Sequence, residues 1–218
     1  MTTQLPVIER IMGANDRLAL RNRARLDEYG VRAINIMASP GAGKTSLILA
    51  TARLLGDRLR LGVIEGDLAS SVDADKVRAA GLPAVQINTG GGCHLDAVQV
   101  GQALAQLPLA ELDVLLIENV GNLVCPVSFA LGEHIRLAIS SVPEGDDKPL
   151  KYPTIYAHVD ALVISKTDLL PYIPFDMAAF QRLVRGLNPQ IAIMPLSCVT
   201  DEGLDAWAAW LLQVAPKR

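Results

Sequence analysis

Three consecutive glycines lead into a cysteine and a histidine in the stretch NTGGGCHLDA, residues 88–97. Cysteine thiolate and histidine imidazole are ligands that Zn²⁺ and Ni²⁺ bind well. A further cysteine, Cys125, lies in ENVGNLVCP, residues 118–126. Cys93, His94 and Cys125 are therefore candidate ligands of a nickel or zinc site, although each alone could also be an ordinary turn residue or a small buried side chain.

Three ligands from one chain leave such a site incomplete, because zinc and nickel normally bind four or more groups. Either water or a second subunit must complete it, and a twofold axis through the site would make metal binding depend on dimerisation. The remaining cysteine, Cys198, is expected to face a nucleotide or to be buried. His134 and His158 have no soft ligand beside them in the sequence and are interpreted as ordinary strand or loop histidines.

A phosphate-binding loop is indicated by ASPGAGKTS, residues 38–46, which matches the pattern GxxxxGK(S/T) apart from Ala38 at the first glycine. Glycines let successive backbone N–H groups turn toward phosphate oxygens, Lys44 would contact the β and γ phosphates, and Thr45 would bind Mg²⁺. A plain glycine-rich turn is the alternative, but a strand and a helix are expected on either side, as the motif requires. The candidate nucleotide-binding residues of this loop are Gly41, Ala42, Gly43, Lys44, Thr45 and Ser46.

Two acidic residues end strands that are predicted to lie near this loop. Asp67 ends LGVIEGD and Glu118 ends DVLLIE, and open α/β sheets bind their ligands at the carboxyl ends of strands. Both residues are candidates to bind Mg²⁺ and, with Lys44, to take part in hydrolysis. Gly121, three residues after Glu118, could offer its N–H to the γ phosphate. A solvated carboxylate at a strand end is the alternative for each acid.

The base is predicted to be guanine, because SKTD, residues 165–168, resembles the signature (N/S)KxD. A carboxylate at Asp168 can accept hydrogen bonds from both N–H groups of guanine, whereas adenine would present a lone pair to it. The aliphatic part of Lys166 can lie along the base plane. Ser165 stands where asparagine is more usual.

A second loop, PLSCVTDEGL at residues 195–204, could bring a backbone N–H to the guanine oxygen. Ser197 and Cys198 are its candidate nucleotide-binding residues. Thr200 or Asp201 could instead be the N-cap of the helix that follows, and the sequence alone does not separate the two roles.

These residues need a framework of parallel strands and crossover helices, and short apolar runs alternate with amphipathic helical patterns along the chain. We expect an α/β fold of the P-loop NTPase type, with a mostly parallel central sheet of about seven strands flanked by helices. The predicted strands cover residues 32–37, 61–65, 84–88, 114–118, 135–140, 161–165 and 191–196. The predicted helices cover residues 44–55, 74–80, 95–107, 176–187 and 204–214.

The chain is expected to divide into an N-terminal helical segment, residues 1–30, and one P-loop GTPase domain, residues 31–218. Residues 134–140, HIRLAIS, alternate between apolar and polar side chains and predict an edge strand with one solvated face. Residues 143–153 are charged and turn-rich and predict a mobile loop. The apolar residues with helical spacing in the N-terminal segment are Ile8, Ile11, Met12, Leu18 and Leu20.

The composition argues against several classes of protein. A chain of 218 residues, 50% of them hydrophobic, can form one sizeable core. A net charge of −3 without a basic cluster argues against binding to nucleic acid or to an anionic membrane. No apolar run reaches the roughly 20 residues of a membrane helix. Three cysteines, an odd number, indicate reduced thiols, so we expect a cytoplasmic protein.

Taken in order, six stretches resemble the HypB family of hydrogenase nickel-incorporation proteins: ASPGAGKT, EGD at residues 65–67, NTGGGCHLDA, ENVGNLVCP, EGDDKPLKYP and SKTDLL. The resemblance covers nearly the whole chain from about Ile34 onward, and GCHLDA and ENVGNLVCP are its most specific parts. It implies a GTPase of the signal-recognition, MinD and BioD class that helps to load nickel into the large subunit of [NiFe]-hydrogenase. Hydrolysis is expected to be slow and regulatory, because no arginine finger or catalytic glutamine is evident in the switch regions.

The resemblance also implies roles for single residues and partners. GTP or GDP, Mg²⁺ and Ni²⁺ or Zn²⁺ would be bound, a homodimer would be favoured by GTP and metal, and a HypA-like nickel protein would be a partner. The chain lacks the family's N-terminal cysteine motif and histidine-rich tract, so a separate nickel store is not expected. The implied site residues are Cys93, His94 and Cys125 for nickel, Lys44 and Thr45 for phosphate, Asp67 and Glu118 for Mg²⁺, and Lys166 and Asp168 for guanine.

Three other readings remain open at this point. A urease-type nickel accessory GTPase shares the fold, but that family carries Cys-Pro-His where this chain has Cys93-His94. A related ATPase without metal function would use Cys93 and Cys125 only for packing, and a strong preference for GTP would exclude it. A nucleotide-binding scaffold without catalysis would show no turnover that depends on Lys44.

Overall fold

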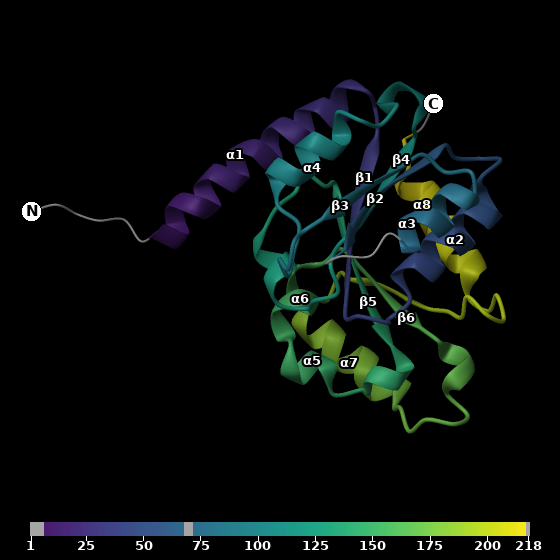
Figure 1. Ribbon diagram of the computed structural model, residues 1–218. Coiled ribbons are helices and arrows are strands. Elements are labelled where there is room, and N and C mark those ends of the chain that lie inside the picture. The colour runs from purple at the N-terminus through teal and green to yellow at the C-terminus, as the bar shows by residue number, and fades with distance from the viewer. Residues whose placement is uncertain (1–6, 68–71, 217–218) are drawn as a thin grey trace, which may run out of the picture.

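The computed structural model describes residues 7–67 and 72–216, and for residues 7–12 it describes the backbone only (Figure 1). Seven parallel strands form one sheet in the order β3-β2-β4-β1-β5-β6-β7. The strands are β1 (Arg32–Ala38), β2 (Leu61–Asp67), β3 (Ala84–Asn88), β4 (Val114–Glu118), β5 (Ile135–Ser141), β6 (Ala161–Ser165) and β7 (Ala192–Pro195). Each lies within two residues of its predicted bounds, so the predicted parallel α/β fold is confirmed.

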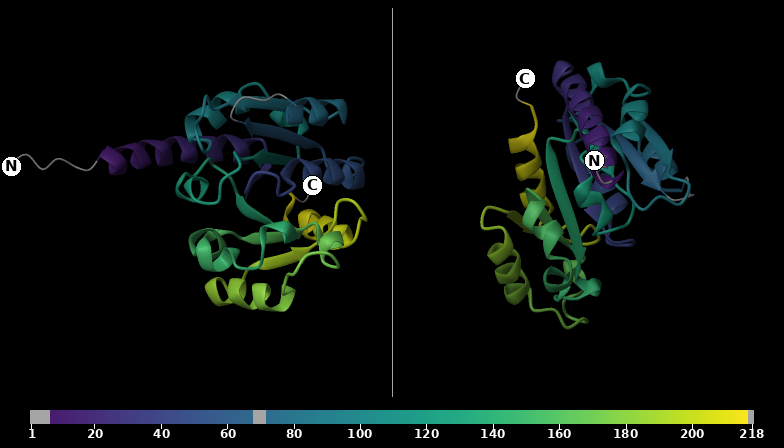
Figure 2. Two further views of the ribbon diagram at one scale, coloured as in Figure 1. Left: turned by 60° about the horizontal axis from the view of Figure 1, so that its bottom comes forward. Right: turned by 90° about the vertical axis from the view of Figure 1, so that its left-hand side faces the viewer.

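Helices cover both faces of the sheet and give the molecule three layers (Figures 1 and 2). One face carries α2 (Lys44–Leu55), α3 (Val72–Ala79) and α8 (Leu204–Val214). The other face carries α1 (Val7–Glu28), α4 (Ala97–Leu104), α6 (Pro153–His158) and α7 (Met177–Leu187), with the short α5 (Lys148–Lys151) beside the last two.

The strand sequences explain why the sheet is buried on both sides. Successive side chains of a strand point to opposite faces. In β1, Ile34 and Ile36 join the core under α2 and α8, whereas Ala33 and Met37 join the cores on the opposite face. An apolar run without alternation therefore fits a central parallel strand.

The prediction that residues 134–140 form an edge strand was wrong. β5 lies between β1 and β6 in the middle of the sheet. Its polar side chains are accommodated by specific bonds: Arg136 donates to Glu133 at 2.8 Å, and Ser140 shares a buried hydrogen bond of 2.7 Å with the Tyr156 hydroxyl. Alternating polarity here reflects satisfied polar groups and not a solvated face.

Residues 143–153 are also more regular than the predicted loop. They begin in a 3-10 turn (Val142–Glu144), where Glu144 accepts from the backbone N–H of Ser141 in a capping box, and they continue into α5. An ion pair between Asp147 and Lys151 spans one turn of α5. His158 lies at the end of α6, so its interpretation as a strand or loop residue was wrong.

Helix α1 forms where a helical segment was predicted, but a different face is buried. Leu20 is 70% exposed, while Asn15, Ala19, Asn22 and Leu26 are buried. The side chains of Ile8, Ile11 and Met12 lie outside the described residues. The first turns of α1 extend away from the sheet, and its later part lies over α4 (Figure 1). Whether residues 1–30 and 31–218 are separate units remains a prediction.

Helix α4 is shorter than the predicted span of 95–107 at both ends. Asp96 is its N-cap, because the Asp96 carboxylate accepts from the Gln99 N–H at 2.8 Å and the Gln99 side chain accepts from the Asp96 N–H at 3.1 Å. Leu95 therefore lies outside the helix, in the loop that carries the candidate metal ligands. Within the described residues, no helix has both the length and the apolar character that a membrane span requires.

Candidate nucleotide and metal sites

The candidate phosphate loop joins β1 to α2 in the centre of the sheet. Gly41 and Gly43 have φ values of 74° and 102°, in the left-handed region that favours glycine. Lys44 is the first residue of α2 and is buried, whereas Ser46 is exposed. Backbone N–H groups and the positive end of the helix dipole meet here, which is the arrangement that binds phosphate.

The predicted guanine signature lies directly beside this loop. The Ser165 hydroxyl donates to the carbonyl of Ala42 at 2.6 Å, and the Lys166 ammonium donates to the carbonyl of Gly41 at 2.7 Å. Lys166 itself has φ of 61°. Serine in place of the usual asparagine therefore still ties the candidate base-binding segment to the candidate phosphate loop.

Ser197 orients the carboxylate that is predicted to bind guanine. Its hydroxyl donates to Asp168 at 2.6 Å and accepts from the backbone N–H groups of Val199 and Thr200 at 3.1 and 3.2 Å. Two loops that follow β6 and β7 are thus joined through one buried hydroxyl. The arrangement supports the predicted placement of Ser197 at the base.

The alternative that Thr200 or Asp201 caps the last helix was wrong. α8 begins after Gly203, which has φ of 76°, and none of the side chains that the structure describes caps it. Asp201 instead accepts a hydrogen bond of 2.9 Å from Arg53 of α2. Cys198 is half-buried in the same loop, and burial raises its pKa to about 11, so it stays a thiol at neutral pH.

The predicted acidic residues lie at the carboxyl edge of the sheet. Glu118 ends β4, and one of its oxygens accepts from the Thr45 hydroxyl at 3.1 Å and lies 3.8 Å from the Lys44 ammonium. Asp67 ends the neighbouring strand β2 and is half-buried. Sequence reasoning missed a third carboxyl, Glu65, which lies opposite Glu118 in the register of β2 and β4.

Glu65 and Glu118 are 2% and 4% exposed, and among the described residues one oxygen of each has no hydrogen-bond partner. Burial, followed by the charge of Glu118, raises the pKa of Glu65 to about 8. Burial also raises the pKa of Glu118, although Lys44 opposes the shift. These carboxyl groups therefore lack sufficient positive charge around them and offer several oxygen atoms. Oxygen ligands of this kind are the ones that Mg²⁺ binds.

A signal for Glu65 was present in the sequence. Alternation along β2 places Glu65 and Asp67 on the same face of a strand whose other residues are apolar or glycine. A carboxylate two residues inside a buried strand is unusual, and its partner is then expected on the adjacent strand.

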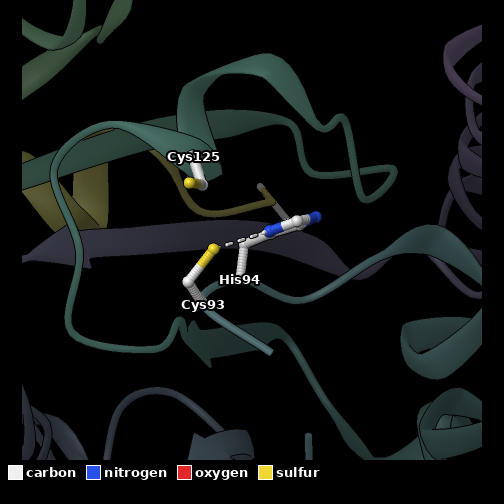
Figure 3. A group of neighbouring side chains, drawn as sticks. All are labelled: Cys93, His94 and Cys125. Carbon is white, nitrogen blue, oxygen red and sulfur yellow. Dashed lines mark hydrogen bonds between the residues drawn. The ribbon is translucent and has the colours of Figure 1, made fainter. Parts of the chain in front are cut away.

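The structure brings the three candidate soft ligands together (Figure 3). One ligand atom each from Cys93, His94 and Cys125 lie within 4.8 Å of one another, and the Cys93 Sγ and His94 Nδ1 are 3.5 Å apart. Ligands of a tetrahedral zinc ion would lie about 3.3–3.8 Å apart. Closing of about one ångström would therefore suffice for coordination. Cys93 is exposed, and the other two are half-buried.

The three glycines explain how this cluster forms. Gly90 and Gly91 have φ of 60° and 98°, so the chain turns sharply at the end of β3. The Thr89 hydroxyl closes this turn by donating to the Gly92 carbonyl at 2.8 Å. After the turn, the His94 ring stacks on Phe129 with centroids 3.9 Å apart. The glycines thus allow the turn, and stacking on Phe129 holds the His94 imidazole in place.

Electrostatics keep Cys93 and His94 uncharged in the absence of metal. The contact with the Cys125 thiol, together with burial, raises the pKa of Cys93. Burial lowers the pKa of His94, so its imidazole is neutral at pH 7. Because coordination requires thiolate, metal binding would release the Cys93 proton.

One segment reaches both sites. Glu118 starts it beside Lys44, and a Cβ at Gly121 would lie only 2.9 Å from the backbone nitrogen of Pro40 in the phosphate loop. Asn122 then donates to the carbonyl of Cys93 at 3.3 Å, and Cys125 ends the segment within the thiol and imidazole cluster. Residues 118–125 therefore contact the phosphate loop at one end and the candidate metal ligands at the other.

Comparison with known proteins agrees with this geometry. A family model described as "CobW/HypB/UreG, nucleotide-binding domain" matches residues 32–195. The hydrogenase maturation factor HypB of Azotobacter vinelandii is 51% identical over 207 residues, which cover 95% of this chain and 68% of that protein.

Two solved structures resemble most of the chain. HypB from Helicobacter pylori in complex with nickel has a TM-score of 0.88 at 38% identity, covering 92% of this chain and 94% of that one. HypB from Archaeoglobus fulgidus has a TM-score of 0.87 at 39% identity, covering 93% and 98%. The resemblance noted in the sequence is confirmed, and the chain belongs to the HypB hydrogenase maturation factors of the CobW/HypB/UreG family.

Proposed function

We propose that this protein is a GTP-hydrolysing metallochaperone that binds nickel, or zinc in its place, at Cys93, His94 and Cys125 and assists nickel insertion during [NiFe]-hydrogenase maturation. The observation that carries the proposal is the path of residues 118–125. This segment begins at Glu118 beside the phosphate loop and ends at Cys125 among the soft ligands. A change at the phosphates would therefore move a candidate metal ligand.

GTP is the expected nucleotide because the candidate base site presents an oriented carboxylate. Asp168 is held by the Ser197 hydroxyl, and Lys166 is anchored on the carbonyl of Gly41. A fixed acceptor matches the two N–H groups of guanine and opposes the lone pair of adenine. The backbone of Cys198 lies in the same loop and could donate to the guanine oxygen.

Hydrolysis would depend on the groups around the phosphate loop. Lys44 would stabilise charge on the β and γ phosphates, and Thr45, Glu118 and Asp67 would hold Mg²⁺. When bound, Mg²⁺ would neutralise developing charge on the phosphates. Turnover is expected to be slow, because neither EGD (65–67) nor ENVGNLVCP (118–126) contains an arginine or a glutamine to assist the attacking water.

Nickel would be cargo and not a permanent structural ion. Three ligands from one chain, with Cys93 exposed, leave coordination positions open to a second copy of the chain. We infer a homodimer favoured by GTP and metal, with the metal at its interface. The H. pylori relative, crystallised with nickel, supports nickel as the cargo.

The expected partners are a HypA-like nickel protein and the hydrogenase large subunit, with neither nucleic acid nor membrane. Cys93, Cys125 and Cys198 are free thiols, which fits work in the reducing cytoplasm.

A transfer assay tests the proposal. Protein loaded with one equivalent of Ni²⁺ is mixed with a HypA-like partner and nickel-free hydrogenase large subunit, and nickel in the reisolated large subunit is measured by mass spectrometry. GTP should promote transfer, ATP should not, and Cys125→Ala should prevent it. Cys198→Ala is the matched control: it keeps the backbone N–H proposed to contact guanine, and it should transfer normally. Equal transfer by Cys125→Ala, or equal support by ATP, would contradict the proposal.

A further inference from the structure

Asn119 is a fully buried polar residue between the two candidate sites, and the proposed function gives it no role. It follows Glu118 at the end of β4, and its backbone N–H donates to the carbonyl of Ile36 in β1 at 3.0 Å. Its side-chain oxygen accepts two hydrogen bonds, from the N–H of Val120 at 2.9 Å and from the N–H of Leu95 at 3.1 Å. Both lone pairs of this oxygen are therefore used.

The orientation of the Asn119 amide is fixed by a series of buried polar side chains. Its nitrogen donates to the Asn35 side-chain oxygen at 3.1 Å, and Asn35 in turn points its nitrogen toward Glu133 at 3.5 Å. Glu133 is anchored by Arg136 at 2.8 Å. Since Asn35 and Asn119 are completely buried, rotation of either amide would leave polar atoms without partners in the core.

Leu95 transmits the position of Asn119 to the soft ligands. It directly follows His94, it is fully buried, and a Cβ added at Gly66 would come within 2.8 Å of its side chain. Gly66 separates Glu65 from Asp67 on β2. Leu95 is thus held between the acidic strand on one side and the Asn119 amide on the other.

One path from the phosphates to the soft ligands runs through this contact, beside the direct hydrogen bond from Asn122 to the Cys93 carbonyl. The peptide between Asn119 and Val120 belongs to the segment 118–125, whose Gly121 lies against Pro40 of the phosphate loop. One oxygen binds both Val120 and Leu95, so a rotation that shifts the first hydrogen bond changes the geometry of the second. Such a rotation would move the Cys93-His94 pair, which precedes Leu95, relative to Cys125.

We propose that Asn119 is a positioning residue that couples nucleotide state to metal affinity, by holding the backbone of Leu95 to the strand end that bears Glu118. The inference rests on the proposed function and adds a contact through which its two sites communicate. Asn119 is not one of the candidate metal ligands, and its hydrogen bonds within the described residues go to Ile36, Asn35, Val120 and Leu95 and not to the phosphate loop, so its loss should leave both binding sites present and weaken the link between them.

The test is a pair of Ni²⁺ titrations of the full chain with Mg²⁺, one with GDP and one with a non-hydrolysable GTP analogue. In the wild type the two dissociation constants should differ by at least about fivefold, the lower end of usual allosteric coupling. In Asn119→Ala the ratio should fall below about twofold, with nucleotide affinity unchanged. Asn188→Ala is the matched control, because it removes an asparagine bond to the Val159 carbonyl at the opposite edge of the sheet.

An unchanged ratio in Asn119→Ala would overturn the inference, as would an equal loss of ratio in Asn188→Ala. If a thermal melt shows that Asn119→Ala does not fold, Asn35→Ser is tested in its place. This change removes the side-chain oxygen that accepts from the Asn119 amide, and it should also lower the ratio. A wild-type ratio of one would show that nucleotide state and nickel affinity are not coupled. In that case, nickel binding that Cys93→Ala abolishes would show that the proposed metal site still stands.

Discussion

The phosphate loop and the soft-ligand cluster lie at the same edge of one sheet but differ in how complete they are. The phosphate loop is braced by hydrogen bonds from Ser165 and Lys166, and its lysine is buried. The cluster is open, with Cys93 exposed and ligand atoms up to 4.8 Å apart. A site fixed by its own chain suits constant binding of nucleotide, whereas an open one suits cargo that must arrive and leave.

The largest effect is expected at the complete site. Lys44→Ala removes the ammonium from the phosphates, and GTP turnover should fall at least about 100-fold, as when other groups that stabilise transition-state charge are removed. Single-turnover phosphate release measures this rate. Nickel binding by the variant with GDP should persist, because the ligands are untouched. Retained turnover would contradict the role given to the phosphate loop.

The open site should be nearly as sensitive to a single change. Cys93→Ala leaves two of the three ligands, and nickel affinity should fall at least about 100-fold, since even loss of a group that only supports a ligand costs 10–100-fold. Competition with a chromophoric chelator measures the affinity. Cys198→Ala, the matched control, should bind nickel like the wild type. An equal loss in both variants would show that the cluster is not the site.

The acidic residues beside the phosphate loop should also make the stability of the protein depend on pH. The folded pKa of Glu65, about 8, lies above its usual 4.5, so the folded protein binds this proton more tightly than the unfolded chain. The resulting stability is complete below about pH 4.5 and is lost as the pH rises through about 8. With chelator present, the free energy of unfolding in urea should fall by a few kcal/mol between pH 5.5 and 8.5.

Glu65→Gln should flatten this dependence, and Glu111→Gln, which changes an exposed glutamate, should leave it as in the wild type. Added Mg²⁺ with GDP should also reduce the slope, because a cation would favour the charged carboxylates. If Glu65→Gln leaves the pH dependence of the wild type unchanged, the group whose proton causes this dependence is not Glu65.

The smallest effect is expected at the residues that are predicted to bind guanine. Ser197→Ala removes the hydroxyl that orients Asp168, and GDP affinity should fall about fivefold, the cost of one hydrogen bond of roughly 1 kcal/mol. Calorimetric titration measures this change. Binding of pyrophosphate, which has no base, should be unaffected. Equal weakening of both ligands would indicate a general loosening of the loop.

Much of the framework could be predicted from the sequence, because apolar runs in a parallel sheet carry their own signal. The strands β1 to β7 and the glycine turn before Cys93 followed from residue types alone. The position of β5 did not, since Ser140 and Arg136 are satisfied by Tyr156 and Glu133, which are distant in sequence or on an adjoining turn. Local alternation cannot show such partners.

The site was predictable to a similar extent. The pairing of Cys93-His94 with Cys125 required only that two loops leave the same edge of the sheet. Glu65 and Asn119 were missed because their importance arises from neighbours: Glu118 across the register and Leu95 across the loop. A carboxylate inside an otherwise apolar strand is the sequence signal that would have found Glu65, whereas Asn119 follows the last residue of β4 and its burial arises only in the folded chain.

The central claim is that nucleotide and metal act together on the open site, and the molar mass in solution tests it most directly. Light scattering would be recorded with GDP or a non-hydrolysable GTP analogue, with and without one equivalent of Ni²⁺. The account predicts a shift to dimer with the analogue, which nickel strengthens in the wild type but not in Cys93→Ala. A monomer under every condition, or an equal response of Cys93→Ala to nickel, would contradict it.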